Sequence, residues 1–167
     1  PTFSLSPKTP WAHPILEELG FQYSSSVHPI LHDLYGWPDS PRFSYTATPN
    51  GLMEIPVTTL HKWGRPWPCG GGGYFRFFLY SYSRWAIKEI NQTEQKPCVF
   101  YIHPWEIDPF QPKQNGLSFK TRFRHYHNLH KTKNRLEKHL KAFSWDTMQH
   151  VFIKTESKGQ QVGNRAA

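Results

Sequence analysis

A histidine, a tryptophan and a glutamate follow directly after a continuous apolar stretch, residues 98–102 (Cys-Val-Phe-Tyr-Ile), which lies between two prolines. An apolar run of this length between two breakers is typical of a strand buried on both faces of a parallel sheet. His103, Trp105 and Glu106 then lie at the carboxyl end of that strand, where α/β enzymes place their catalytic groups. A lone histidine is more often structural, but an indole and a carboxylate beside it indicate a site that combines acid–base chemistry with an aromatic face.

Basic and aromatic side chains gather in a second region, after residue 112. Cations and rings interleaved in this way could neutralise and stack single-stranded nucleic acid, could bind an acidic glycan, or could simply cover the surface of the domain. The histidines of this region do not follow a zinc-ligand pattern, so metal binding by them is not favoured. The members of the region are Arg122, Phe123, Arg124, His125, Tyr126, His127, His130, Lys131 and Lys133.

The composition limits the classes of protein that remain. A length of 167 residues corresponds to one domain or a large part of one, and the formal charge of +8 favours an anionic partner. No apolar stretch is long enough to span a bilayer. Two cysteines, Cys69 and Cys98, are too few for a disulfide framework or a zinc ribbon, and we interpret both as ordinary thiols. The chain begins at Pro1 rather than at Met, so we expect a preceding portion.

The elements that would position the candidate site follow from periodicity. We predict a helix over 10–19, kinked at Pro14 or beginning near it, and a clearer helix over 79–91. Each is followed by a strand, at 21–23 and at 98–102, and this repetition suggests a parallel sheet or barrel.

The remaining segments carry further expectations. Residues 52–60 read as a strand interrupted at Pro56, and the four glycines 70–73 as a flexible loop over a cleft, because their spacing matches no phosphate-binding motif. Thr132 is expected to cap a last helix and Trp145 to begin a short final strand.

Short motifs spread over residues 1 to about 145 resemble, in their order, those of a known enzyme family. They are Pro1-Thr2-Phe3-Ser4, Thr9-Pro10-Trp11, Leu19-Gly20-Phe21, Tyr23-Ser24-Ser25-Ser26, His28-Pro29-Ile30, His32-Asp33, Tyr35-Gly36, Pro38, Pro41-Arg42-Phe43, Glu54-Ile55-Pro56, Gly71-Gly72-Gly73-Tyr74, Tyr101-Ile102-His103-Pro104-Trp105-Glu106 and Arg124-His125-Tyr126. Together they resemble the C-terminal part of the NodB-homology polysaccharide deacetylases. The branch most similar is the one associated with exosortase and exopolysaccharide gene clusters.

The resemblance implies a distorted (β/α) barrel and the metal-dependent hydrolysis of N-acetyl groups on a glycan. In that family an Asp and two His hold a divalent metal, with zinc as the expected ion. A second Asp is the general base, and a His of the last motif is the general acid. The last motif maps onto His103, followed here by Pro104 as in the exosortase-associated branch. A backbone amide near Thr2 or Phe3 matches the oxyanion-stabilising position. The branch usually has Asp where this chain has Ser24.

We therefore expect an α/β fold that is the C-terminal part of a deacetylase-type barrel with a helical C-terminal extension. Residues 1–112 would be the barrel part, 113–154 the family-specific region and 155–167 a disordered tail. The metal-binding motifs would precede Pro1, so this chain alone is expected to hold no cofactor and to be inactive.

The expected site consists of His103 as the catalytic acid and Thr2, Phe3, Trp105 and Glu106 as substrate-binding residues, with no metal ligand. Glu106 is expected to raise the pKa of His103, and Trp105 either to face a sugar or to be a core residue. The expected partner is an N-acetylated polysaccharide or oligosaccharide, without nucleic acid. The location is left open between the bacterial cytoplasm and the periplasm. A non-catalytic glycan-binding module and a basic nucleic-acid-binding domain remain the alternatives.

Overall fold

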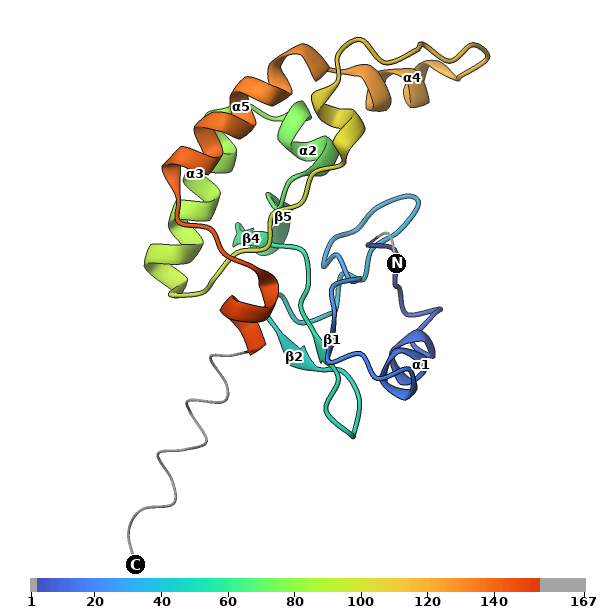
Figure 1. Cartoon of the computed structure of the whole chain (residues 1–167), viewed down its shortest axis with the longest axis vertical. Helices are drawn as coiled ribbons and strands as arrows, with labels where there is room; N and C mark the ends of the chain where they lie inside the picture. The colour runs from blue at the N-terminus through green and yellow to red at the C-terminus, as the bar shows by residue number, and fades with distance from the viewer. Residues whose placement is uncertain (1–2, 154–167) are drawn as a thin grey trace, which may run out of the picture.

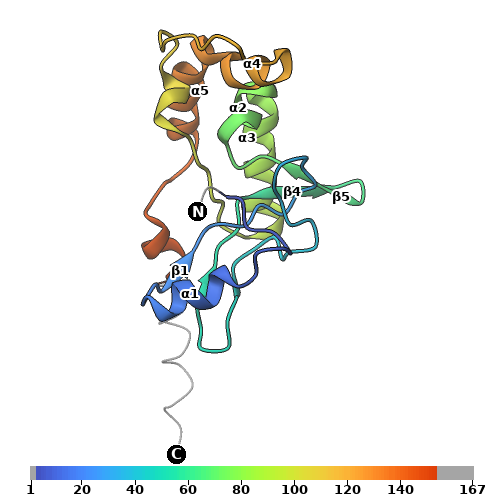
Figure 2. The ribbon, with the colours of Figure 1, turned by 90° about the vertical axis from the view of Figure 1, so that its right-hand side faces the viewer.

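The computed structural model describes residues 3–153, in which small sheets and helices occupy different parts of the molecule. Four helices, α2 to α5, lie together in one half, and α1 with the N-terminal strands lies in the other (Figures 1 and 2). The helices are α1 (Ala12–Glu18), α2 (Gly72–Phe77), α3 (Tyr80–Glu89), α4 (Phe119–Tyr126) and α5 (Leu129–Ala142). The strands are β1 (Tyr23–Ser24), β2 (Tyr45–Thr46), β3 (Met53–Glu54), β4 (Thr59–Lys62) and β5 (Arg65–Pro68). Three further helical turns are Ile90–Glu94, Pro104–Ile107 and Gln149–Ile153.

The strands form two small sheets. In the first, β3 lies between β1, to which it is parallel, and β2, to which it is antiparallel; Tyr23 lies opposite Met53 and Tyr45 opposite Glu54. In the second, β4 and β5 make an antiparallel hairpin. Its turn consists of Trp63 and Gly64, with φ angles of +53° and +72°. This turn type suits the right-handed twist of the two strands.

Parallel pairing extends beyond the named strands. Leu5 bridges to Val27, and Gly71 bridges to Tyr101, each in the parallel sense. The amide of Val57 donates to the carbonyl of Val27, which prolongs the β1–β3 contact. The segments around residues 5, 27 and 57 therefore lie side by side in chain order. Closure into a barrel stays a prediction.

The apolar core joins the two halves through two clusters. Leu60 of the hairpin packs with Ala86 and Ile90 of the α3 region, and Met53 packs with Ile55 and Val99. His13 of α1 is buried against the same sheet, where its Nε2 lies 2.9 Å from Oε2 of Glu54.

The predicted helices are present with shifted ends. The first is α1, which begins at Ala12, so that Pro14 is its third residue, where a backbone N–H has no helical partner and proline is tolerated. The second is α3, continued by the turn Ile90–Glu94. The last is α5, which begins at Leu129; Thr132 lies inside it, and its hydroxyl donates to the carbonyl of Asn128 rather than capping the helix.

The expected strands are shorter than predicted. Residues 98–102 are extended, but among the described residues they form a β-bridge only at Tyr101, and Val99 is their one buried member. One side of this segment faces a pocket and not a second strand, so burial on both faces is wrong. Residues 52–60 contain β3 and the start of β4 on either side of Pro56, as expected. Trp145 begins no strand, and the tail 155–167 lies outside the described residues.

The glycine-rich segment is packed and not a free loop. The φ of Gly71 is +105°, and a Cβ there would lie 2.0 Å from the carbonyl oxygen of Tyr101. Gly71 and Gly72 are buried, and the amide of Gly72 donates to that same carbonyl. The glycines thus allow the backbone to approach residues 101–102 closely, and the expectation of a flexible loop is wrong.

Candidate functional site

The histidine of interest precedes a short 3₁₀ turn at the end of the extended segment. His103 has an extended backbone, and the turn Pro104–Ile107 begins with a proline, whose missing N–H costs nothing at this position. The carboxylate of Glu106 reaches back and accepts the backbone N–H of His103 at 2.9 Å. The amide of Glu106 donates to the carbonyl of His103 at 2.9 Å. The sequence His-Pro-Trp-Glu therefore folds as a turn closed on its own first residue.

A buried arginine holds this turn in place. The Nε of Arg76, in α2, lies 2.8 Å from Oε1 of Glu106, and both side chains are buried. The other guanidinium nitrogens donate to three carbonyls at the end of α4 and just after it, those of Arg124, His125 and His127. Arg76 thereby joins the turn, α2 and the C-terminal helices. A buried ion pair with this many hydrogen bonds is costly to break.

These contacts change the role of Glu106. Its two carboxylate oxygens bind Arg76 and a backbone N–H, and it has no exposed surface. We expected it to contact substrate and the imidazole of His103. It instead positions the turn, because it contacts the backbone of His103 and not its ring.

Trp105 lies in a stack of flat groups. Its indole is parallel to the ring of His125 at 4.3 Å and 10°, and to that of His103 at 5.9 Å and 8°. The guanidinium of Arg76 lies 5.0 Å from the indole centroid. The side chain is half-buried, so it packs against the protein and retains an accessible portion, and its contact with a sugar stays a prediction.

His125 was not predicted as a site residue, although the stretch Arg124-His125-Tyr126 was part of the resemblance and of the basic region. Its Nε2 lies 2.9 Å from the amide oxygen of Gln111. Burial, with the positive charge of Arg76 added, lowers the pKa of its imidazole below the ordinary value. Near neutral pH the ring beside Trp105 is therefore uncharged. Arg76 was missed altogether, because its partner Glu106 lies thirty residues away.

Phe3 reaches the same region from the N-terminal end of the described chain. Its ring lies 4.4 Å from that of Tyr101, which in turn lies 5.5 Å from the ring of His103. Phe3 has a φ of +53°, a conformation that is uncommon for a residue with a side chain and that concentrates at functional sites. Thr2 lies outside the described residues. The structure thus brings Phe3, His103 and Trp105 into one neighbourhood, with Tyr101 between the first two.

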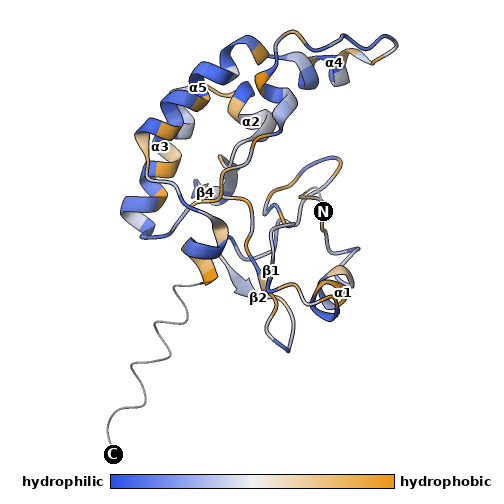
Figure 3. Ribbon diagram, viewed as in Figure 1, coloured by the Kyte–Doolittle hydropathy of each residue, from blue (hydrophilic) through white to orange (hydrophobic). Residues whose placement is uncertain are grey.

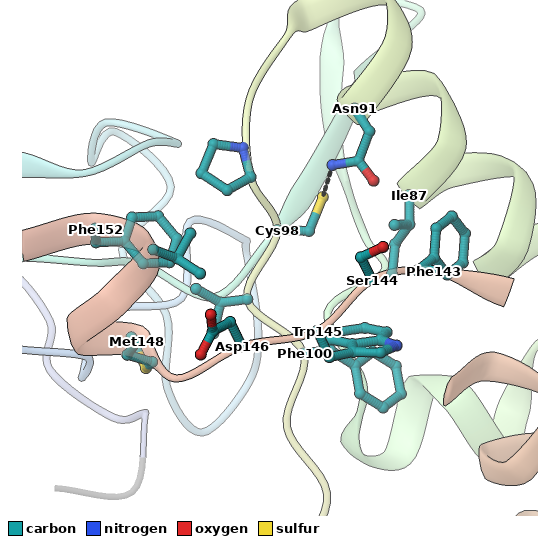
Figure 4. Close-up of a pocket in the computed structure, with 13 residues that line it drawn as sticks. Ile87, Asn91, Cys98, Phe100, Phe143, Ser144, Trp145, Asp146, Met148 and Phe152 are labelled. Carbon is teal, nitrogen blue, oxygen red and sulfur yellow. Dashed lines mark hydrogen bonds between the residues drawn. The ribbon is translucent and has the colours of Figure 1, made fainter. Parts of the chain in front are cut away.

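A pocket of about 420 Å³ lies beside the start of the extended segment (Figure 4). Phe100 and Trp145 lie against each other there, and Met148 and Phe152 come from the C-terminal turn. Burial raises the pKa of the Cys98 thiol to about 12, and the amide of Asn91 approaches its sulfur at 3.6 Å. A thiol that stays protonated is a poor nucleophile, so Cys98 is not favoured as a catalytic group of this pocket.

Residues 3–153 contain neither a metal-binding cluster nor a membrane-spanning helix. No group of three or more His, Cys, Asp or Glu in this range is arranged to hold a metal ion. In the same range, no helix combines the length and the apolar character needed to cross a bilayer.

Comparison with known proteins identifies a domain family. No curated protein and no solved structure matches the chain. The model of a domain of unknown function, DUF3473, matches residues 25–153, which is 129 of 167 residues and includes Arg76, His103, Trp105 and His125. Apart from Phe3, the site described above therefore lies within a domain of this family, and the chain belongs to the DUF3473 family.

Proposed function

We propose that this chain is the C-terminal part of a metal-dependent polysaccharide deacetylase and that His103 is the general acid of the whole enzyme. The observation that carries the proposal is the placement of His103. It ends an extended segment, begins a turn closed by Glu106, and lies beside the half-buried indole of Trp105. The motif Tyr-Ile-His-Pro-Trp-Glu at residues 101–106 resembles the last motif of that family.

The chemistry assigned to His103 is a proton transfer. When an N-acetyl group is hydrolysed, the amine leaves only after its nitrogen has gained a proton, which an imidazolium can donate. A metal held by a preceding portion would polarise the acetyl carbonyl. The clamp of Arg76 on Glu106 fixes the backbone of His103, so the direction of the imidazole would be set before substrate arrives.

A glycan-binding module without chemistry is the second candidate. The stack of Trp105 with His125 favours it, because aromatic faces of this kind suit the apolar face of a sugar ring. Such a module would bind an oligosaccharide equally well with or without the imidazole of His103.

The first test is the coding sequence upstream of Pro1. The deacetylase proposal requires, in frame, an Asp-Asp motif and a His-x-x-x-His motif. An upstream sequence without both motifs would reject the proposal and leave the binding module.

The second test uses the longer protein. His103→Gln should lower kcat for acetate release from an N-acetylated oligosaccharide by roughly two to four orders of magnitude, with unchanged metal content. His130→Gln, an exposed histidine on α5, is the matched control and should keep wild-type turnover. The 167-residue chain, dialysed against zinc, should bind no stoichiometric metal and release no acetate from chitooligosaccharides. Turnover by His103→Gln at the control rate contradicts the assignment.

A further inference from the structure

A second pocket, of about 430 Å³, lies between the loop 32–35, α2 and α4. Its walls are largely aromatic. Phe77 and Phe123 lie edge to face at 6.2 Å and are 57% and 40% exposed, respectively. Large apolar rings that stay exposed within a concavity are typical of ligand sites and unusual on a merely solvated face.

Polar groups are also present within this aromatic pocket. Tyr35 and Tyr74 line it, and burial raises the pKa of each above its ordinary value, so both keep their hydroxyl protons near neutral pH. The ring of Tyr35 is stacked on that of His32 at 3.9 Å. A few hydroxyl groups among apolar rings match the two sides of a pyranose, which has an apolar face and a polar edge.

Two cations of α4 define one side of the pocket. Lys120 and Arg124 lie one helical turn apart and both contact Asp33: the lysine Nζ lies 2.7 Å from Oδ2, and the arginine Nη2 lies 3.1 Å from each carboxylate oxygen. These contacts hold the pKa of Asp33 well below its usual range. Two positive charges against one negative charge leave the pocket with an excess of one.

The surrounding segment strengthens this positive field. Residues 113–141 contain nine Lys or Arg and one acidic residue, Glu137, a net charge of +8 that equals the formal charge of the whole chain. The helices α4 and α5 are mostly hydrophilic along their length (Figure 3). An anionic ligand would therefore be attracted to this face in particular.

We propose that this pocket binds a carboxylated sugar residue, such as a hexuronate, of an acidic polysaccharide. The carboxylate would be held by Lys120 and Arg124, and the sugar ring would lie on Phe123. Arg76 lines this pocket and also lies beside Trp105, so a neighbouring sugar could reach the candidate site. The choice of a glycan over other anions rests on the proposed function.

The carboxylate of Asp33 provides an acceptor for sugar hydroxyl groups beside the two cations. It is 42% exposed, so it can accept hydrogen bonds from sugar hydroxyls. Asp33 repels a phosphate and a uronate carboxylate alike, so only contacts with the sugar hydroxyls would distinguish the two ligands. Stacking of a base on Phe123 remains the competing outcome.

The experiment is an NMR or calorimetric titration of the 167-residue chain with a hyaluronan hexasaccharide, in which glucuronate alternates with N-acetylglucosamine, and with chitohexaose as the neutral counterpart. The acidic oligosaccharide should bind at least about tenfold more tightly at low salt. Lys120→Gln and Arg124→Gln should each weaken its binding about tenfold, and Phe123→Ala should weaken it as well. Lys133→Gln and Lys138→Gln, cations of α5 that do not line the pocket, should change affinity less than twofold. The melting temperature of each variant reports whether it is folded.

Several results would overturn the proposal. Equal affinity for chitohexaose would show that the sugar carboxylate takes no part in recognition. Equal losses of affinity in the α5 control variants would show that binding depends on the overall positive charge and not on this pocket. Tighter binding of oligo(dT) than of the hexasaccharide would identify a nucleic-acid site. Binding is measured here without acetate release. Specific binding by this chain, together with no acetate release by the longer protein, would support the pocket and reject the deacetylase. Acetate release by the longer protein, without specific binding by this chain, would support the deacetylase and reject the pocket.

Discussion

The guanidinium of Arg76 and the carboxylate of Glu106 form a buried ion pair, with Nε 2.8 Å from Oε1, that fixes the turn after His103. The same arginine donates to three carbonyls at the end of α4 and just after it. One side chain thus couples the candidate catalytic turn to the C-terminal helices. The site is therefore shared between residues 101–107 and a region that the sequence assigned to a separate extension.

Removing this arginine should destabilise the protein strongly. In Arg76→Met the carboxylate of Glu106 loses its partner in a buried position, and three carbonyls lose a donor. We expect the free energy of unfolding, measured by denaturant titration, to fall by about 3–5 kcal/mol. Lys62→Gln is the matched control, because the pair of Lys62 with Glu89 is partly exposed and should be worth no more than about 1 kcal/mol. Similar losses in both variants would show that burial does not matter here.

Alanine at Gly71 should also be costly. Its φ of +105° disfavours any side chain, and the new Cβ would collide with the carbonyl of Tyr101. We expect a loss of about 3 kcal/mol or more in stability. Gly64→Ala has a positive φ but open space around the Cβ, so it should cost only about 1–2 kcal/mol. Equal costs would mean that backbone strain alone, and not the close approach to Tyr101, requires glycine at position 71.

Trp105→Ala should lower stability moderately. The indole loses its stack with His125 and its contact with the guanidinium of Arg76. Contacts of these kinds are worth about 1–2 kcal/mol together, below the cost of truncating a fully buried tryptophan. Trp63, which is 79% exposed, provides the control, and Trp63→Ala should change the melting temperature little. A loss as large as that of a core tryptophan would make Trp105 a structural residue and remove it from the candidate site.

Stability should fall as the pH falls from about 6.5 to 4. Burial among aromatic rings lowers the pKa of His139 from 6.5 to about 4, and His28 behaves in the same way, with the charge of His32 adding to the effect of burial. Because the folded-state pKa lies below the unfolded one, the unfolded chain takes up the proton first. Each histidine therefore makes its full contribution to the free energy of unfolding above pH 6.5. Up to about 3 kcal/mol of that contribution is lost by pH 4.

The variant His139→Phe isolates this contribution. The difference in unfolding free energy between pH 7.5 and pH 5 should become smaller in His139→Phe than in the wild type. His130→Gln, at an exposed position of α5, should keep the wild-type difference. Asp33 and Glu17 do not affect this comparison. The pKa of each carboxyl is lowered, so the stabilisation that each contributes is lost only at lower pH. An unchanged pH dependence in His139→Phe would contradict the prediction.

Local patterns in the sequence were sufficient for several elements. Apolar residues at helical spacing predicted α1, α3 and α5, and Pro56 correctly marked the interruption between β3 and β4. These features depend on backbone preferences and on neighbours three or four residues away, which the order of residues states directly. The same reading placed His103 and Trp105 side by side at the end of an extended segment.

Only the tertiary structure decided what surrounds those residues. Glu106 looked like a functional carboxylate, yet it is paired with Arg76 from another helix, and His125 lies against Trp105 from a segment twenty residues later. Residues 98–102 looked like a strand buried on both faces, yet one side lines a pocket. Such outcomes depend on which distant groups meet, and neither periodicity nor composition specifies a partner for a charged or aromatic side chain. The sequence alone thus identified the candidate acid, and the fold determined what holds it in place.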